Sequence, residues 1–179
     1  GGATLGSGTI VAGSVAITTS VLPVGSDLIT ASYGGDSNNN AATGTATQTV
    51  SKATPTVALT SSVNPAAVNQ AVTFTATVPT TATGTITFKY GAATLGTSTV
   101  VNGVATASTS TLPIGSDVIT ATYNGDANNN TASSSLTETV NKATPTVTVT
   151  TSGPSTYGNP VTITTTLPPG TTGTVTVTS

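Results

Sequence analysis

The chain repeats itself with a fixed shift. The segment KATPTV occurs at Lys52–Val57 and again at Lys142–Val147, a shift of 142 − 52 = 90 residues. GSDLITASYGGDSNNN at Gly25–Asn40 matches GSDVITATYNGDANNN at Gly115–Asn130 with the same shift. A repeat of this length indicates copies of one supersecondary unit, so the fold of a single unit determines the fold of the whole chain.

The repeat divides the chain into one complete unit and two partial ones. Residues 53–142 form the complete unit, residues 1–52 match the C-terminal part of a unit, and residues 143–179 match the N-terminal part. Joining Ser179 to Gly1 neither omits nor duplicates a residue of the repeat. We therefore expect a neighbouring copy to complete each partial unit, either within a longer continuous chain or by exchange of strands between protomers.

Alternating side chains within the repeat indicate strands. In Gly115–Asn130, Ile119, Ala121 and Tyr123 fall on one face of an extended segment, and a valine and two threonines fall on the other. Period-two alternation suits a half-buried strand, and the β-branched residues that dominate the chain favour strands. No helical period occurs. The pattern predicts an all-β fold of immunoglobulin-like β-sandwich repeats in tandem, with about 90 residues per unit.

Turn signals separate the expected strands of the complete unit. Residues 61–70, SSVNPAAVNQ, are expected to form a turn because they are rich in proline and asparagine. Asn102-Gly103 is a typical hairpin turn. The expected strands are Pro55–Ser61, Ala71–Val78, Gly84–Tyr90, Thr94–Leu95, Thr99–Val101, Val104–Thr109, the alternating run that follows Gly115, and Ser133–Val140.

The composition argues against several classes of function. Charged residues make up 4% of the chain, the net charge is −2, and all three basic residues are lysines. Nucleic-acid affinity rests on many Lys and Arg contacts to phosphate, so no nucleic-acid partner is expected. Without His or Cys the chain has no Ser-His-Asp or Cys-His site, and we expect neither an enzyme nor a cofactor. Apolar runs fall short of the roughly 20 residues of a membrane helix, so membrane insertion is not expected.

Two loops are weak candidates for calcium. Asp36 precedes Asn38–Asn40, and Asp126 precedes Asn128–Asn130, so each loop offers several oxygen atoms. Calcium takes six to eight oxygen ligands, usually several of them from carboxylates, and each loop has one carboxylate. The alternative is a structural turn, because Asn and Gly tolerate left-handed backbone conformations. The turn is the expected outcome, and no metal is assigned.

Several motifs together resemble a known family. They are P-T-V, V-T-F-T-A-T-V, G-T-I-T-F, A-T-L-G, N-G-V-A-T, S-T-L-P-x-G-S-D and I-T-A-T-Y-N-G-D. This pattern resembles the bacterial Ig-like repeats of large secreted and cell-surface proteins. The resemblance implies an extracellular or cell-surface location and a non-enzymatic role.

The linker between units is expected to meet acidic residues. In a sandwich of this kind the Asn-rich loop lies at the N-terminal end of its unit, and the turn before the same strand lies at the other end. Asp27, Lys52 and Asp126 should therefore approach one joint, and Asp117 and Lys142 occupy the matching positions at the next. Either Lys52 bridges acidic residues and limits bending, or it is a solvated lysine that contributes ~0–1 kcal/mol.

Two functions fit these expectations. The first is a structural extracellular segment that builds a stalk, fibre or filament from tandem Ig-like domains, with neighbouring copies of itself as partners. The alternative is an adhesin or carbohydrate-binding module that uses loops at the ends of the domains to bind a glycan or a host or cell-surface ligand. Exposed aromatic clusters would favour the alternative, but Tyr33, Tyr90 and Tyr123 fall at core-facing positions, and only Tyr157 lies in a turn.

Overall fold

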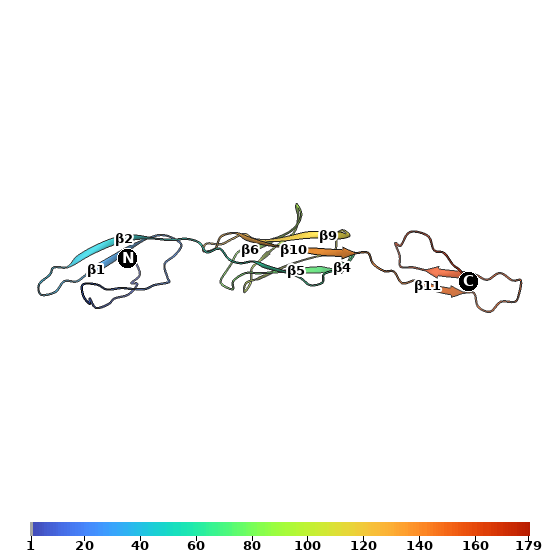
Figure 1. Cartoon of the computed structure of the whole chain (residues 1–179), viewed down its shortest axis with the longest axis horizontal. Coiled ribbons are helices and arrows are strands. Elements are labelled where there is room, and N and C mark those ends of the chain that lie inside the picture. The colour runs from blue at the N-terminus through green and yellow to red at the C-terminus, as the bar shows by residue number, and fades with distance from the viewer. Residues whose placement is uncertain (1) are drawn as a thin grey trace.

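The computed structural model describes residues 2–179, and Gly1, which forms one side of the expected seam, lies outside the described residues. Three groups of strands follow one another along the long axis of the molecule (Figure 1). They hold two, eight and two strands. Among residues 2–179 there is no helix with the length and hydropathy of a membrane-crossing segment.

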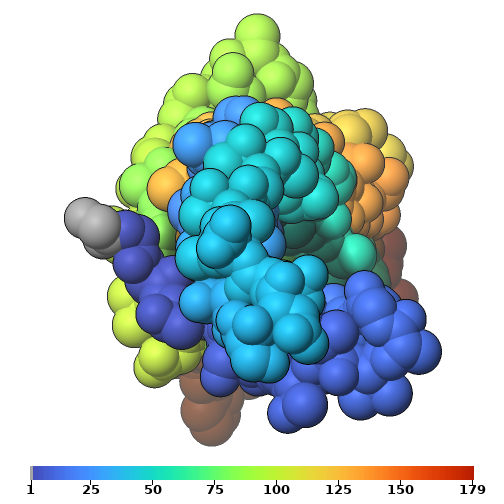
Figure 2. Space-filling model, turned by 90° about the vertical axis from the view of Figure 1, so that its left-hand side faces the viewer, coloured from blue at the N-terminus to red at the C-terminus, as the bar shows by residue number. Residues whose placement is uncertain are grey.

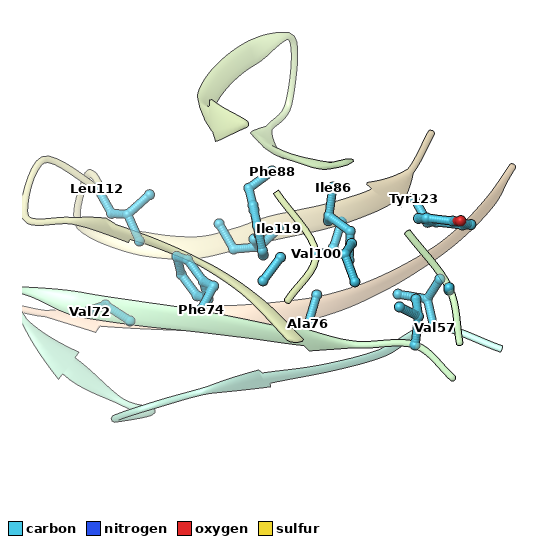
Figure 3. Close-up of a cluster of buried hydrophobic side chains, with 14 of the residues drawn as sticks. Val57, Val72, Phe74, Ala76, Ile86, Phe88, Val100, Leu112, Ile119 and Tyr123 are labelled. Carbon is cyan, nitrogen blue, oxygen red and sulfur yellow. The ribbon is translucent and has the colours of Figure 1, made fainter. Parts of the chain in front are cut away.

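The central group forms two sheets, whose strands are antiparallel except that β4 pairs in parallel with β10. The larger sheet has the strand order β4-β10-β9-β6-β7, and the smaller has the order β3-β5-β8. The strands are β3 (Ala58–Ser61), β4 (Ala66–Ala67), β5 (Val72–Thr77), β6 (Thr85–Tyr90), β7 (Ala93–Thr99), β8 (Val104–Thr109), β9 (Gly115–Tyr123) and β10 (Ala132–Asn141). Side chains from both sheets meet between them (Figure 3), which confirms the predicted immunoglobulin-like β-sandwich.

The core follows the alternation of the sequence. Phe74 on β5, Phe88 on β6, and Ile119 and Tyr123 on β9 are fully buried, and Figure 3 shows them directed into the space between the sheets. Each alternates with a more exposed neighbour, because successive side chains of a strand point to opposite faces. Burying a side chain of this size stabilises the fold by ~1.5–3 kcal/mol, so these residues hold the unit together.

Two expected features of the central unit are wrong. One strand, β7, covers Thr94–Leu95 and ends at Thr99, and a register shift between Phe88 and Lys89 lets it pair with β6. The expected strand Thr99–Val101 does not form, since Val101 makes only an isolated bridge with Val104. Within the turn expected at 61–70, β4 pairs in parallel with the end of β10. The proline and asparagine content of this segment indicates a turn, but the edge of β10 provides backbone hydrogen-bond partners for Ala66–Ala67, which therefore form a short strand.

Each flanking group is a two-stranded antiparallel sheet. β1 (Gly25–Tyr33) pairs with β2 (Ala42–Val50), and β11 (Thr148–Thr151) pairs with β12 (Ile163–Thr166). Both occupy the positions that the repeat assigns to them: β1 and β2 correspond to β9 and β10, and β11 and β12 correspond to β3 and β5. The boundaries 1–52, 53–142 and 143–179, and the number of repeats, stay predictions.

Candidate inter-domain joint

The loop that follows β9 is folded around the carboxylate of Asp126. Its Oδ1 accepts hydrogen bonds from the main-chain N–H groups of Asn128 at 2.8 Å and Asn129 at 2.7 Å. The N–H of Asp126 itself donates to the carbonyl oxygen of Asn129 at 3.0 Å. Gly125 precedes it with φ +80°, and an added Cβ would lie 2.9 Å from the Asn129 carbonyl oxygen, so the loop requires glycine there.

The second oxygen of Asp126 ties this loop to the rest of the sandwich. Oδ2 accepts from the Tyr123 hydroxyl at 2.8 Å, and from the N–H and hydroxyl of Thr83 at 2.9 and 3.0 Å. Donors on a carboxylate favour its charged form. The hydrogen bond from the Thr83 N–H is the largest cause that holds the pKa of Asp126 below its usual range. Burial, and then the hydrogen bond to Asp126, raise the pKa of Tyr123 to about 12.

The linker that enters the central unit is bonded to this loop. The N–H of Ala53 donates to the Asn128 carbonyl at 2.9 Å, and the N–H of Asn130 donates to the Ala53 carbonyl at 2.8 Å. The Lys52 ammonium donates to the carbonyl oxygen of Asp126 at 2.7 Å. The Asn130 side-chain amide donates to the Thr54 hydroxyl at 3.2 Å. We call Lys52–Thr54 together with Asp126–Asn130 the linker clasp.

Lys52 thus meets Asp126 through the main chain rather than through an ion pair. The carboxylate oxygens of Asp126 are already surrounded by donors from Thr83, Tyr123 and Asn129, which leaves its carbonyl oxygen as the available acceptor. A sequence argument that pairs opposite charges cannot anticipate this geometry. Lys52 is thus bonded to a main-chain carbonyl oxygen and not to the acidic side chains that it was expected to bridge.

The loop of the N-terminal group repeats the same internal bonds. The Asp36 Oδ1 accepts from the N–H groups of Asn38 at 2.8 Å and Asn39 at 2.7 Å, and its Oδ2 accepts from the Tyr33 hydroxyl at 2.7 Å. These bonds, with that from Tyr33 the largest, lower the pKa of Asp36 to about 2. The bonds that Thr83 makes to Asp126 have no counterpart at Asp36 among residues 2–179.

This arrangement favours structural turns over calcium sites at Asp36 and Asp126. N–H and O–H donors point at both carboxylates, and a metal ion would have to displace them. Among residues 2–179 there is no group of three or more His, Cys, Asp or Glu side chains able to hold a metal.

The other residues expected at the joints lie elsewhere. Asp27 on β1 lies opposite Gln48 on β2, and its Oδ2 is buried with no hydrogen-bond partner in residues 2–179. Asp117 on β9 turns into the sandwich rather than toward Lys142, whose side chain is exposed. The structure therefore brings Lys52 and Asp126 together but does not bring Asp27 or Asp117 to a lysine.

The partner of Asp117 is a second buried acid. Asp117 and Glu138 lie directly opposite each other on β9 and β10, with 3% and 0% of their surfaces exposed. The Oδ2 of Asp117 and both carboxyl oxygens of Glu138 have no hydrogen-bond partner in residues 2–179. Burial, followed by the charge of Asp117 and a hydrogen bond to it, raises the pKa of Tyr90. The sequence signal for the burial of Asp117 is its place in the alternating run, because Asp117 falls on the same face of the strand as Ile119.

Comparison with known proteins finds a family model that matches the central unit. Residues 59–141 match the family model of the bacterial Ig-like domain (group 3). The match extends from β3 to β10, and the linker half of the clasp lies just before it. A search of curated proteins found no match.

Proposed function

Because residues 59–141 match the family model of the bacterial Ig-like domain, we propose that the chain is a stiff structural segment of an extracellular stalk or filament. A match to this family suggests a structural or surface domain. The three groups of strands lie in a row along one axis (Figure 1), as a spacer requires. Beyond what this match suggests, we propose that the chain lies outside the cell and has a mechanical role.

The linker clasp is the observation that carries the proposal. A short polar linker with no contacts would act as a flexible tether. Here β2 ends at Val50 and the clasp begins at Lys52, so Ser51 is the only residue between them. Two main-chain hydrogen bonds and the Lys52 and Asn130 side chains attach the linker to the central unit. A joint of this kind transmits orientation from one unit to the next.

Single-molecule fluorescence transfer tests the stiffness of the joint. The chain contains no cysteine, so Leu28→Cys on β1 and Val101→Cys in the central unit place two dyes at exposed positions. The double variant Lys52→Ala with Asn130→Ala removes the side-chain bonds of the clasp. We expect its distance distribution to be clearly broader than that of the parent chain. Dilution to single molecules keeps association between chains out of the measurement.

Lys142→Ala is the matched control. It makes the same change in the same sequence, KATPTV, at the second linker, where the side chain is exposed. We expect it to leave the distribution unchanged. Equal distributions for the double variant and the parent chain would rule out the clasp as a stiffening device.

Glycan recognition is the second candidate, and it rests on Tyr157. This side chain is fully exposed in the loop between β11 and β12, whereas Tyr33, Tyr90 and Tyr123 face the interior of their units. Aromatic side chains presented in this way can stack on ligands. A glycan array compares the parent chain with Tyr157→Ala. Glycan binding that the substitution abolishes would favour a binding module. If the parent chain binds no glycan, the structural role remains as the single candidate function.

A further inference from the structure

Asp117 and Glu138 lack the partners that buried acids normally have. They lie directly opposite each other on β9 and β10, and with 3% and 0% of their surfaces exposed they are shielded from water. Both carboxyl oxygens of Glu138 and the Oδ2 of Asp117 have no hydrogen-bond partner in residues 2–179. Buried polar groups are hydrogen-bonded and buried charges are paired in almost all proteins. The pair therefore requires a donor or a positive charge between its two carboxyl groups.

The central unit offers this pair one other titratable side chain, Tyr90 on β6. The charge of Asp117 and a hydrogen bond to it help to raise the pKa of Tyr90, so the two groups are in contact. β3, β4, β5, β7 and β8 contain no titratable residue. Lys89 is exposed and alternates with Tyr90 on β6, and Lys142 follows the end of β10 and is also exposed. Neither lysine neutralises the pair, and the loop of Asp126 lies beyond the other end of β9.

The repeat indicates which of the two acids is neutral. The first copy has Asp27 where the second has Asp117. Opposite Asp27, the first copy has Gln48 where the second has Glu138. Protonated glutamic acid resembles glutamine, because both side chains are neutral and both can donate a hydrogen bond. The hydroxyl of Tyr90 agrees with this assignment, since a donor on the carboxyl group of Asp117 favours its charged form.

We infer that Asp117 and Glu138 bind one proton between them, and that the O–H of neutral Glu138 donates a hydrogen bond to the Asp117 carboxylate. Residues directly opposite each other in an antiparallel pair have Cβ atoms ~4.5–5.5 Å apart, so two carboxyl groups on one face reach each other. Two carboxylates that share a site cannot both carry a charge away from water. One proton from the solvent removes a charge and creates a charge-assisted hydrogen bond, which gives both residues a partner.

Proton binding makes the stability of the central unit depend on pH. Acidic side chains of an unfolded chain are charged above about pH 5, so folding there takes up one proton. Because the folded state then binds more protons than the unfolded state, the unfolding equilibrium constant rises about tenfold per pH unit for as long as the pair retains its proton. Asp126 acts in the opposite direction, since its contribution is lost below about pH 4. The unit is therefore most stable near about pH 4.5.

Urea unfolding of the full chain between about pH 5 and about pH 9 tests the inference. The chain has no histidine, so no other side chain of ordinary pKa changes its charge in this range. We expect the unfolding equilibrium constant of the parent chain to rise about tenfold per pH unit from the acidic end of the range. Asp117→Asn and Glu138→Gln each leave one carboxyl group opposite an amide, and each should give a flat profile.

Infrared spectroscopy detects the bound proton directly. At about pH 6 exposed acidic side chains are charged, so the folded parent chain should show the carbonyl band of one protonated carboxyl group. The band should be lost in Asp117→Asn and in Glu138→Gln. A pair that only fills space in the core would produce neither this band nor the dependence of stability on pH.

The matched control is Asp27→Asn. It makes the same change at the matching position of the first group of strands, whose blue and cyan residues face the viewer in Figure 2. Because Asp27 lies opposite an amide and shares no proton, this variant should keep the pH profile and the carboxyl band of the parent chain.

Two results would overturn the inference. The first is a flat pH profile, or the absence of the carboxyl band, in the parent chain. The second is a stability that rises with added calcium chloride and falls again with a chelator, because a metal ion would then occupy the place of the proton. The experiments follow the unfolding of the central unit, so their outcome is independent of the stiffness of the linker clasp.

Discussion

At the scale of the residue, the acidic pair inside the central sandwich is the most unusual feature. Asp117 and Glu138 face each other across adjacent strands, and three of their oxygen atoms lack a hydrogen-bond partner in residues 2–179. An unsatisfied buried polar group costs about 1–3 kcal/mol. The N-terminal partial unit has Gln48 where the central unit has Glu138, so the repeat accommodates an amide at this position.

Replacing Glu138 with Gln should therefore stabilise the central unit. The amide can donate a hydrogen bond to Asp117, and the change removes one of two buried carboxyl groups. We expect the free energy of unfolding to rise by about 1–3 kcal/mol, as measured by urea unfolding followed by circular dichroism. Gln48→Glu is the control and should leave this transition unchanged. A loss of stability in Glu138→Gln would mean that both acids are needed.

At the scale of the element, the loop after β9 depends on the protonation of two groups. The pKa of Asp126 lies below its usual value, so its contribution to stability is complete above about pH 4 and is lost as the pH falls further. The pKa of Tyr123 is raised to about 12, so its contribution is complete below about pH 10 and is lost as the pH rises toward 12.

Tyr123→Phe should destabilise the central unit and reduce its alkaline loss of stability. The substitution removes the 2.8 Å hydrogen bond to Asp126, at a cost of about 1 kcal/mol at neutral pH. Tyr90, whose pKa is also raised, should account for the alkaline loss that remains. Urea unfolding between pH 2 and pH 12 measures both effects. Tyr33→Phe, the same change in the N-terminal partial unit, should leave them unaltered. An unchanged alkaline loss in Tyr123→Phe would contradict the assignment.

At the scale of the whole molecule, the near absence of charge predicts insensitivity to salt. Charged residues are 4% of the chain, so there is little attraction or repulsion for ions to screen. We expect the free energy of unfolding of the central unit to change by no more than about 0.5 kcal/mol between ~0.05 and ~1 M sodium chloride. Urea unfolding followed by circular dichroism at several salt concentrations measures this. A larger loss of stability at high salt would reveal an ion pair that contributes to the fold.

Particular residues show how far the sequence alone could predict the fold. The alternation of side chains along the strand predicted that Ile119, Ala121 and Tyr123 face the core, and their burial confirms this prediction. β8 matches the expected strand Val104–Thr109 at both ends, because a hairpin turn with φ values of +51° at Asn102 and +78° at Gly103 sets its start. β4 was missed because two residues of a turn-like segment become a strand only beside the edge of β10.

The candidate joint was harder to predict, for a related reason. Opposite charges suggested that Lys52 and Asp126 lie close together, yet Lys52 donates its hydrogen bond to the main-chain carbonyl oxygen of Asp126. Because every residue has a carbonyl oxygen, the sequence does not show which one accepts this bond. Alternation along β9 places Asp117 on the same face as the core residue Ile119, although it was expected at a joint. That Glu138 lies opposite Asp117 depends on the register between β9 and β10. Register is a property of two strands, and neither strand's sequence determines it alone.

The repeat period, the alternation within each strand and the positions of the turns were determined by the sequence by itself. Only the tertiary structure decided which of the matching segments become strands. Residues 104–109 form β8 beside β5, whereas most of the matching residues 14–19, which have no such neighbour, form no strand. The reason is that a strand's backbone hydrogen bonds go to another strand, so a segment becomes a strand only where the fold supplies its partner.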